Sequence, residues 1–348
     1  MSEQRKSAGG KGLEPGTKVL LALGGGSARG IAHIGVIHAL EEAGLVIAGI
    51  AGTSIGSAIG GVYAAGEMDA YEEFMCAIGR RGVLRMLDPV LPRSGLFAGK
   101  RLSDLLKSFV GDVCIEDLAV PYSAVAVDVS GGDEVRIRSG SLVKAMRASF
   151  GIPGLFTPFP LQLPGETDVR FLVDGGVASP VPVMAARELG DLPIVAVNVN
   201  RGFAEPVIQK KPVEPPSGPS RRERLAAFFE SERVPRAARE YLRSFFDSSN
   251  GKARQADDLE SETDSRSSFL SRWSGLFTSG EASAKRPGMV DSLYNSVLLL
   301  QHHLARSQFL AEPPALLIEP NMEGIGLFDY HLGTLLVEEG ARATREAL

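Results

Sequence analysis

Residues 46–56 read VIAGIAGTSIG, an apolar run that ends in a Gly-x-Ser-x-Gly pentapeptide. The apolar part, Val46–Ala51, has the length and composition of a buried β-strand. A run of small residues suited to a helix follows, to about Ala65. A strand that turns sharply into a helix lifts the central serine clear of the sheet, which makes Ser54 a candidate nucleophile. The alternative is a tight turn in which Ser54 or Thr53 caps the helix.

Strand and helix patterns alternate on both sides of this stretch. Apolar runs typical of strands occur at Val19–Leu23, Ser123–Asp128, Glu134–Arg138, Val169–Val173, Pro193–Val199 and Ala315–Glu319. Apolar residues recur with helical spacing at about Gly30–Ala43, Leu142–Ala148, Val181–Leu189, Val290–Ser307 and Leu327–Ala347. Strands separated by helices favour a mostly parallel sheet with helices on both faces, so the sequence predicts an α/β fold.

The composition of the 348 residues limits the class of protein. Hydrophobic residues make up 44% of the chain and charged residues 23%, which is typical of a globular protein with a packed core. The net charge of −5 gives no basic field that would attract nucleic acid, so we expect no nucleic-acid partner. The two cysteines, Cys76 and Cys114, form no CxxC pair, which excludes a disulfide framework and a cysteine-built zinc site.

Segments that would carry the chain into or through a membrane are not evident. The first sixteen residues are polar and glycine-rich, unlike a signal peptide. No apolar run approaches the roughly 18–20 residues of a membrane span. Two widely separated cysteines suit a reducing compartment. We therefore expect a cytoplasmic protein, and a peripheral contact with a membrane stays open.

A glycine-rich loop, Gly24–Gly30 with the sequence GGGSARG, lies between the first predicted strand and the first predicted helix. Consecutive glycines leave backbone N–H groups unobstructed and directed at one small volume, as an oxyanion site requires. The competing interpretation is a dinucleotide fingerprint, but Ser27 and Arg29 stand where GxGxxG needs glycine, and the chain has no GxxxxGK motif. Arg29 could stiffen the loop by pairing with a carboxylate, or it could simply cap the structure.

A serine nucleophile needs a base, and the sequence offers two kinds. The five histidines lie in helical stretches, at His33, His38, His302, His303 and His331. His331 has the chain order of an α/β-hydrolase histidine but lies in no recognisable motif. Asp174 ends an apolar strand and is followed by Gly175 and Gly176, which let other backbone come close. A carboxylate at such a place is costly unless it has partners, so we favour Asp174 as the base over a merely structural turn.

Three motifs, taken together, resemble the patatin-like phospholipases, and in particular their bacterial and neuropathy-target-esterase branch. They are the Gly24–Gly30 loop, the Gly52–Gly56 pentapeptide and Asp174-Gly175-Gly176, in that order. The stretches Ala148–Phe156 and Gly326–Asp329 also fit the family's pattern. The resemblance implies a three-layer α/β/α domain around a mostly parallel sheet.

The resemblance also implies an activity: hydrolysis of carboxylic ester bonds of phospholipids or lysophospholipids through an acyl-enzyme, with no cofactor and no metal. Ser54 would be the nucleophile and Asp174 the proton acceptor of a Ser–Asp dyad. The oxyanion would be held by backbone N–H groups of Gly25, Gly26 and Ser27, and the supporting positions would be Arg29, Gly30, Gly52, Gly56, Gly175 and Gly176. Ser27 departs from the glycine that the family often has there, which matters if this position requires a positive φ.

Two other functions stay open on the sequence alone. A protein that resembles this family could be a catalytically weak binding or regulatory module. It could also be an esterase for soluble esters of the α/β-hydrolase type, with His331 as its base. A lipid or lysolipid is the partner that the resemblance implies.

Residues 202–288 interrupt the α/β pattern. We therefore expect one patatin-like catalytic domain made of 17–201 and 289–348, and a flexible N-terminal tail at 1–16. The stretch Glu205–Ser220 contains five prolines and several charges. Such a composition cannot form a packed layer, so we expect the insertion to be partly disordered.

Three apolar stripes lie inside this insertion, two within Leu225–Phe246 and a third at Phe269–Phe277, and arginines lie beside or within them. Their spacing predicts amphipathic helices. Aromatic and basic amphipathic helices favour membrane surfaces, so the stretch 221–277 could contact a membrane or cover the active site as a lid. The alternative is that the stripes pack onto the domain itself or form a dimer contact.

Overall fold

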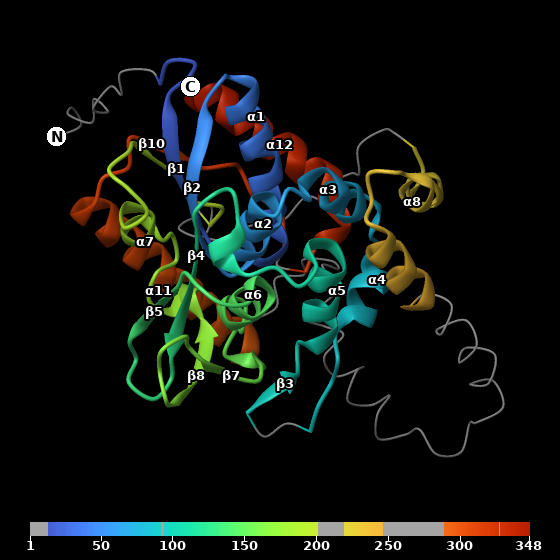
Figure 1. The fold of residues 1–348 in the computed structure, drawn as a ribbon, viewed down its shortest axis with the longest axis horizontal. Helices are drawn as coiled ribbons and strands as arrows, with labels where there is room; N and C mark the ends of the chain where they lie inside the picture. The colour runs from blue at the N-terminus through green and yellow to red at the C-terminus, as the bar shows by residue number, and fades with distance from the viewer. Residues whose placement is uncertain (1–12, 92–93, 201–218, 246–288, 327) are drawn as a thin grey trace.

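The computed structural model describes residues 13–91, 94–200, 219–245, 289–326 and 328–348. Among these residues the central sheet has eight strands, of which five adjacent ones run parallel in the order β10-β9-β1-β2-β4 (Figure 1). The parallel strands are β1 (Lys18–Leu23), β2 (Val46–Thr53), β4 (Tyr122–Asp128), β9 (Ile194–Val197) and β10 (Leu316–Ile318). This arrangement confirms the predicted mostly parallel α/β sheet.

Antiparallel strands extend the sheet on the side of β4. Strand β8 (Val169–Asp174) pairs with β4 and then with β7 (Phe159–Gln162), while β5 (Glu134–Ile137) also pairs with β4. A separate pair, β3 (Gly95–Phe97) and β6 (Gly154–Phe156), is parallel. Strand β8 runs antiparallel to β4, and its register pairs its last residue, Asp174, with Ala126 of β4. The neighbouring residue of β4, Val125, pairs with Thr53 of β2, so Asp174 lies close to the end of β2.

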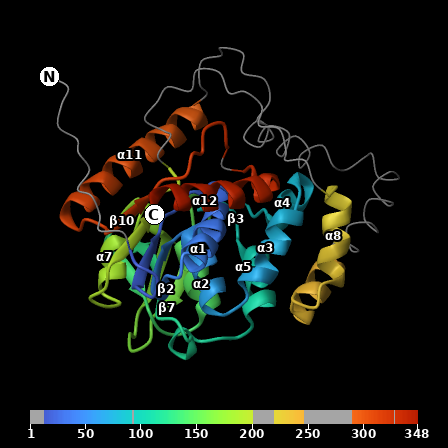
Figure 2. The same cartoon turned by 90° about the horizontal axis from the view of Figure 1, so that it is seen from above.

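Helices cover both faces of the sheet (Figures 1 and 2). One face carries α1 (Ala32–Glu42), α2 (Ile55–Ala64), α6 (Leu142–Ser149) and α12 (Gly333–Ala347). The other face carries α7 (Val183–Arg187) and α11 (Met289–Ala311). The three predicted layers are therefore present. Within the described part of the chain, no helix combines the length and the apolar character that a membrane span would need.

Strand β1 shows why the sheet is buried on both faces. Its alternate residues Val19, Leu21 and Leu23 pack into the larger core, under α1 and α2. Leu20 and Ala22 point the other way and pack against α7. A strand buried on both faces needs an uninterrupted apolar run instead of an alternating one, and Val19–Leu23 has this composition.

Three helices outside the predicted set form a side layer next to α2 and α6: α3 (Met68–Ala77), α4 (Arg80–Met86) and α5 (Lys100–Val110) (Figure 1). Helix α8 (Arg221–Glu230) packs on α3, with Phe228 1% exposed and the rings of Phe74 and Phe228 5.9 Å apart. A capping box begins α8, because Ser220 and Glu223 each accept the other's backbone N–H.

A second helical segment, 236–245, follows α8 and joins the same core. Val234, Ala238 and Leu242 are at most 1% exposed. The two apolar stripes predicted within Leu225–Phe246 therefore pack onto the domain as far as residue 245, which is the alternative that the sequence left open. The third stripe, Phe269–Phe277, lies outside the described residues.

Two predicted helices begin at later residues than expected, and the 3-10 turns that precede them contain residues of the site. The helix predicted from Gly30 is preceded by a 3-10 turn, Ser27–Ile31, and α1 starts at Ala32. The helix predicted from Leu327 is preceded by another 3-10 turn, Tyr330–Leu332, and α12 starts at Gly333. The carboxylate of Asp329 accepts the N–H of Gly326 at 2.8 Å and so closes a tight turn before this helix.

Candidate active site

Ser54 occupies the sharp turn between β2 and α2. Its backbone has φ 56° and ψ −123°, a conformation that residues with a β-carbon rarely adopt. The flanking glycines are required by close contacts. A β-carbon on Gly52 would lie 2.4 Å from the Cα atom of Ser57, and one on Gly56 would lie 2.2 Å from the carbonyl oxygen of Leu23. The pentapeptide therefore folds as the predicted elbow, with the serine at its tip.

Ser149, at the end of α6, links the backbone of the elbow to strand β4. Its Oγ atom accepts the N–H of Ser54 at 2.9 Å and donates to the carbonyl oxygen of Val125 at 2.6 Å. Ser149 is completely buried. Ser149 was not among the predicted site residues, although it lies in the stretch Ala148–Phe156 that fits the family's pattern.

Asp174 lies within hydrogen-bonding distance of Ser54. The hydroxyl of Ser54 donates to Oδ2 of Asp174 at 2.5 Å, and the N–H of Gly176 donates to Oδ1 at 2.8 Å. Burial raises the pKa of Asp174 to about 6, although the hydrogen bonds from Ser54 and Gly176 act in the opposite direction. A carboxylate with this pKa is ionised at neutral pH and can still accept a proton.

The glycine loop passes directly over Ser54, since a β-carbon on Gly25 would lie 3.4 Å from that of Ser54. The N–H of Gly24 donates to Val197 and the N–H of Gly25 donates to Pro180, at 3.0 and 2.9 Å. Gly25 was predicted as an oxyanion donor, but its N–H is already bonded to a carbonyl. Among the described residues no acceptor is found for the N–H of Gly26 or of Ser27.

Arg29 ties this loop to the C-terminal part of the chain. Its guanidinium is 5% exposed and donates to the carbonyl oxygen of Ile325 through Nε and Nη2, at 3.0 and 2.6 Å. Nη1 donates to Asn200 at 3.4 Å, and the side-chain amide of Asn200 in turn donates to the carbonyl oxygen of Gly25 at 2.9 Å. Arg29 therefore stiffens the glycine loop, as one of the two interpretations predicted. The acceptors of these hydrogen bonds are a backbone carbonyl oxygen and a side-chain amide oxygen.

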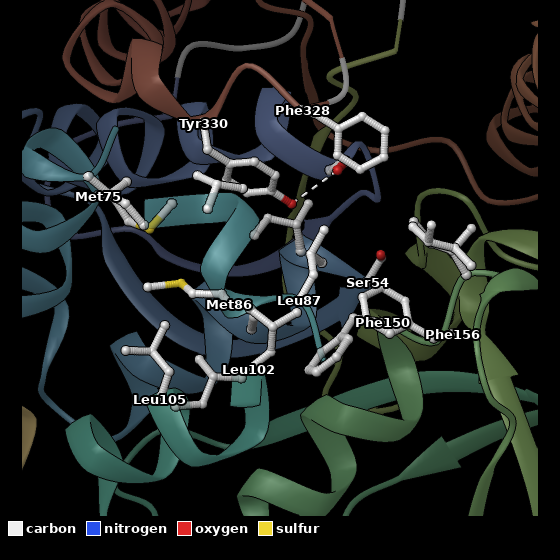
Figure 3. A pocket seen from close by; sticks show the side chains of 18 of the residues that line it. Ser54, Met75, Met86, Leu87, Leu102, Leu105, Phe150, Phe156, Phe328 and Tyr330 are labelled. Atoms are coloured by element: carbon white, nitrogen blue, oxygen red, sulfur yellow. Dashed lines mark hydrogen bonds between the residues drawn. The ribbon is translucent and has the colours of Figure 1, made fainter. Parts of the chain in front are cut away.

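An apolar pocket of about 110 Å³ opens beside Ser54 (Figure 3). It is lined by Ser27, Ser54, Phe328 and Tyr330, by residues of the segment 150–156, and by side chains of α3, α4 and α5 such as Met75, Met86, Leu102 and Leu105. In Figure 3 the two methionines and Leu105 lie at the opposite end of the pocket from Ser54. The pocket is therefore suited to a hydrocarbon chain whose head lies at the serine.

The histidines lie away from this pocket, because none of its lining residues within the described ranges is a histidine. Nδ1 of His331 lies 3.9 Å from the carboxylate of Asp329, and the Ser54 hydroxyl donates to Asp174 instead. His33 bonds the carbonyl oxygen of Gly24 at 2.8 Å, and burial lowers its pKa to about 4. Nowhere in the described residues do three or more His, Cys, Asp or Glu side chains gather as metal ligands would.

The site thus combines a strained serine at an elbow, a buried carboxylate bonded to it and an apolar pocket, which is a geometry of the serine-hydrolase type. The family model of patatin-like phospholipase matches residues 21–187, a range that includes the glycine loop, the elbow and Asp174. Residues 21–187 of this chain therefore form a patatin-like phospholipase domain by similarity to that family model.

Curated relatives agree with this assignment. An uncharacterised NTE family protein of Mycobacterium bovis is 41% identical over 195 residues, covering 56% of this chain and 52% of the relative. The human patatin-like phospholipase domain-containing protein 6 is 35% identical over 188 residues, covering 53% of this chain and 13% of that protein. The chain thus spans about half the length of the mycobacterial relative. A solved structure, VipD from Legionella pneumophila, is similar with a TM-score of 0.40 and 15% identity over 52% of this chain and 49% of that chain.

Proposed function

We propose that this protein is a serine lipid-acyl hydrolase that cleaves carboxylic ester bonds of phospholipids or lysophospholipids. The observation that carries the proposal is the 2.5 Å hydrogen bond from Ser54 to the buried Asp174, at the head of an apolar pocket. The patatin-like domain supports the same chemistry. Ser54 is the nucleophile and Asp174 the base of a Ser–Asp dyad.

Acylation begins when Asp174 takes the proton of Ser54 and the serine oxygen attacks the ester carbonyl. The raised pKa of Asp174, about 6, makes the carboxylate a better base than an exposed aspartate would be. The negative charge that develops on the carbonyl oxygen is stabilised by the N–H groups of Gly26 and Ser27. Each donor of this kind is worth roughly 2.7–4 kcal/mol in serine hydrolases.

Collapse of the tetrahedral intermediate breaks the ester bond. Asp174 returns its proton to the departing alcohol oxygen, and the acyl group stays on Ser54. A water molecule then gives a proton to Asp174 and attacks the acyl carbonyl. When this second intermediate collapses, Asp174 returns the proton to the departing Ser54 oxygen and the fatty acid is released. Asp174 therefore acts as a base twice and as an acid twice in one cycle.

The chemistry of the pocket supports a lipid as substrate. No charged residue is among its described lining residues. The polar lining residues are Ser27, Ser54, Tyr71 and Tyr330, and Ser54 lies at the head of the pocket. A fatty acyl chain would fill the apolar part, while a polar head group would stay outside. The relatives' names, patatin-like phospholipase domain-containing protein among them, support a lipid substrate in the same way.

The test is covalent labelling followed by turnover. A fluorophosphonate probe reacts with activated serines, so we expect it to label the wild-type protein but not Ser54→Ala. Turnover of phosphatidylcholine, lysophosphatidylcholine and a triglyceride, each in mixed micelles, then ranks the ester classes. The proposal fails if the wild-type protein is not labelled, or if labelling is unchanged in Ser54→Ala.

A further inference from the structure

The C-terminal segment touches the glycine loop at a second point, beside the site. The hydroxyl of Tyr330 and Oγ of Ser27 form a hydrogen bond of 3.0 Å, drawn as the dashed line from Tyr330 in Figure 3. Both residues line the pocket together with Ser54. The two partners are 303 positions apart in the sequence, so the contact exists only in the folded chain.

Ser27 has an unusual backbone. Its φ is 51°, in the left-handed region that favours glycine, and among the described non-glycine residues only Ser27 and Ser54 have a positive φ. A residue with a β-carbon is strained there, and such strain persists only where the surroundings hold it. At Ser27 the side chain makes a hydrogen bond to Tyr330, whereas a glycine would have needed no such contact.

The environment of Tyr330 keeps its hydroxyl neutral. Burial raises the pKa of Tyr330, the hydrogen bond with Ser27 lowers it, and the nearby negative charge of Asp174 raises it further. A neutral phenol can act as donor or acceptor towards Ser27. Tyr330 also lines the same pocket as Ser54.

We infer that Tyr330 is a positioning residue for the glycine loop. Its hydroxyl holds Ser27 in the left-handed conformation that leaves the N–H groups of Gly26 and Ser27 free for the substrate. The inference rests on the proposed function and adds a residue to it. Tyr330 acts through Ser27, so its hydroxyl matters for the placement of the oxyanion donors and not for binding of the acyl chain.

The first test removes the hydroxyl alone. Tyr330→Phe should lower kcat for a soluble short-chain nitrophenyl ester by about tenfold and leave KM within about twofold, because donors made for the transition state are displaced while the pocket is kept. This loss is smaller than the roughly 10²–10³ caused by removing a whole oxyanion donor. Ser27→Ala removes the other partner and should give the same loss, and the double variant should be no worse than either.

The second test is a rescue. Glycine adopts φ near +50° without strain, so Ser27→Gly should not need the tether. We expect Ser27→Gly/Tyr330→Phe to recover kcat to within about threefold of the wild-type value, which a general loss of stability would not allow. Tyr122→Phe is the matched control: Tyr122 also bonds a serine hydroxyl, that of Ser57 at 2.7 Å, but neither residue lines the pocket. Its kcat should stay within about twofold of wild type.

The rate of fluorophosphonate labelling, measured on the same variants, separates the possible failures. Slower labelling of Tyr330→Phe with recovery in the double variant supports the inference. Equal labelling and turnover in wild type and Tyr330→Phe overturn it while leaving the proposed function intact. A loss that Ser27→Gly does not rescue also overturns it, because Tyr330 would then act on the substrate directly. A wild-type protein that is not labelled overturns the proposed function and this inference with it.

Discussion

Ser54 and Ser27 invite comparison because they share a strained backbone and differ in what holds it. Both have a positive φ, 56° and 51°, and both line the same pocket. Ser54 directly precedes α2, and Ser27 is the first residue of a 3-10 turn. The conformation of Ser54 comes from its sequence neighbours, since the glycines at 52 and 56 allow the backbone approaches that form the elbow. Ser27 is bonded instead to Tyr330, from the other end of the chain.

The difference separates two kinds of catalytic geometry. A turn that is built from adjacent glycines is encoded locally and can be recognised as a motif. A turn that relies on a distant hydroxyl is encoded by the tertiary fold, so its sequence looks like an ordinary substitution of glycine by serine. We expect changes near Ser54 to remove the chemistry itself and changes near Ser27 to weaken it by degrees.

The largest effect is expected at the partner of Ser54. Asp174→Asn keeps the size of the side chain but removes the base, so turnover should fall by about 10⁴-fold or more. The double variant Ser54→Ala/Asp174→Asn should be no worse than either single change, because the two residues act as a unit. Steady-state hydrolysis of one lipid and one soluble ester measures this. Near wild-type turnover in Asp174→Asn would exclude the dyad and make His331 the next residue to test.

Acidic pH should lower turnover by protonating Asp174, the partner of Ser54, and should leave the hydrogen bond between Ser27 and Tyr330 unchanged. Burial raises the pKa of Asp174 to about 6, so the carboxyl is protonated, and lost as a base, as the pH falls through this value. Turnover should be level above about pH 7 and fall about tenfold per unit below the pKa, to about 1% at pH 4.

Tyr330→Phe should show the same pH profile on a lower plateau, since neither Ser27 nor Tyr330 titrates in this range. A pH–rate profile of kcat/KM for wild type and Tyr330→Phe, with circular dichroism to confirm that both stay folded, tests this. A pH-independent rate between pH 4 and 8 would contradict the assignment of Asp174 as the base.

Prediction from the sequence succeeded where the determinants are local. The Gly52–Gly56 elbow and the apolar strand that ends at Asp174 both contain their own signals, and the alternation of strands and helices predicted the sheet and the helices on both of its faces. The pKa of Asp174 could not be predicted, because it depends on burial by parts of the chain that are far away in sequence.

Other parts of the site depend on distant contacts and were missed for that reason. Ser149 meets the Ser54 backbone across 95 positions, and Tyr330 meets Ser27 across 303. The spacing of the glycines could not reveal that the N–H of Gly25 donates to the carbonyl oxygen of Pro180. The pocket helices α3 to α5 were also not predicted, and part of the surface that covers α3 comes from α8, about 150 positions later.

A smaller effect is expected from the residue that supports the elbow. Ser149→Ala leaves the buried N–H of Ser54 without its acceptor, which should lower the free energy of unfolding by about 1–3 kcal/mol. Turnover should fall roughly tenfold, less than the 10² that a 1 Å misplacement can cause. The matched control is Ser123→Ala, because Ser123 is another buried serine whose hydroxyl has no partner among the described residues. Equal behaviour of the two variants would show that Ser149 does not position Ser54.

The smallest effect on turnover is expected far from both serines, at Phe228 on α8. Its ring is 1% exposed and packs 5.9 Å from Phe74, so Phe228→Ala should lower the free energy of unfolding by about 3–5 kcal/mol through the cavity it leaves. Glu230→Ala, an exposed position on the same helix, should change it by less than about 0.5 kcal/mol. Below its melting temperature Phe228→Ala should keep kcat for a soluble ester within about twofold, since neither strained turn is touched. Denaturant unfolding and kcat measured on the same preparations test both parts. Unchanged stability would mean that α8 is not part of the core. A large loss of kcat in the folded variant would mean that the geometry of Ser54 and Ser27 depends on this side layer. The contrast between a locally supported Ser54 and a distantly supported Ser27 would then no longer hold.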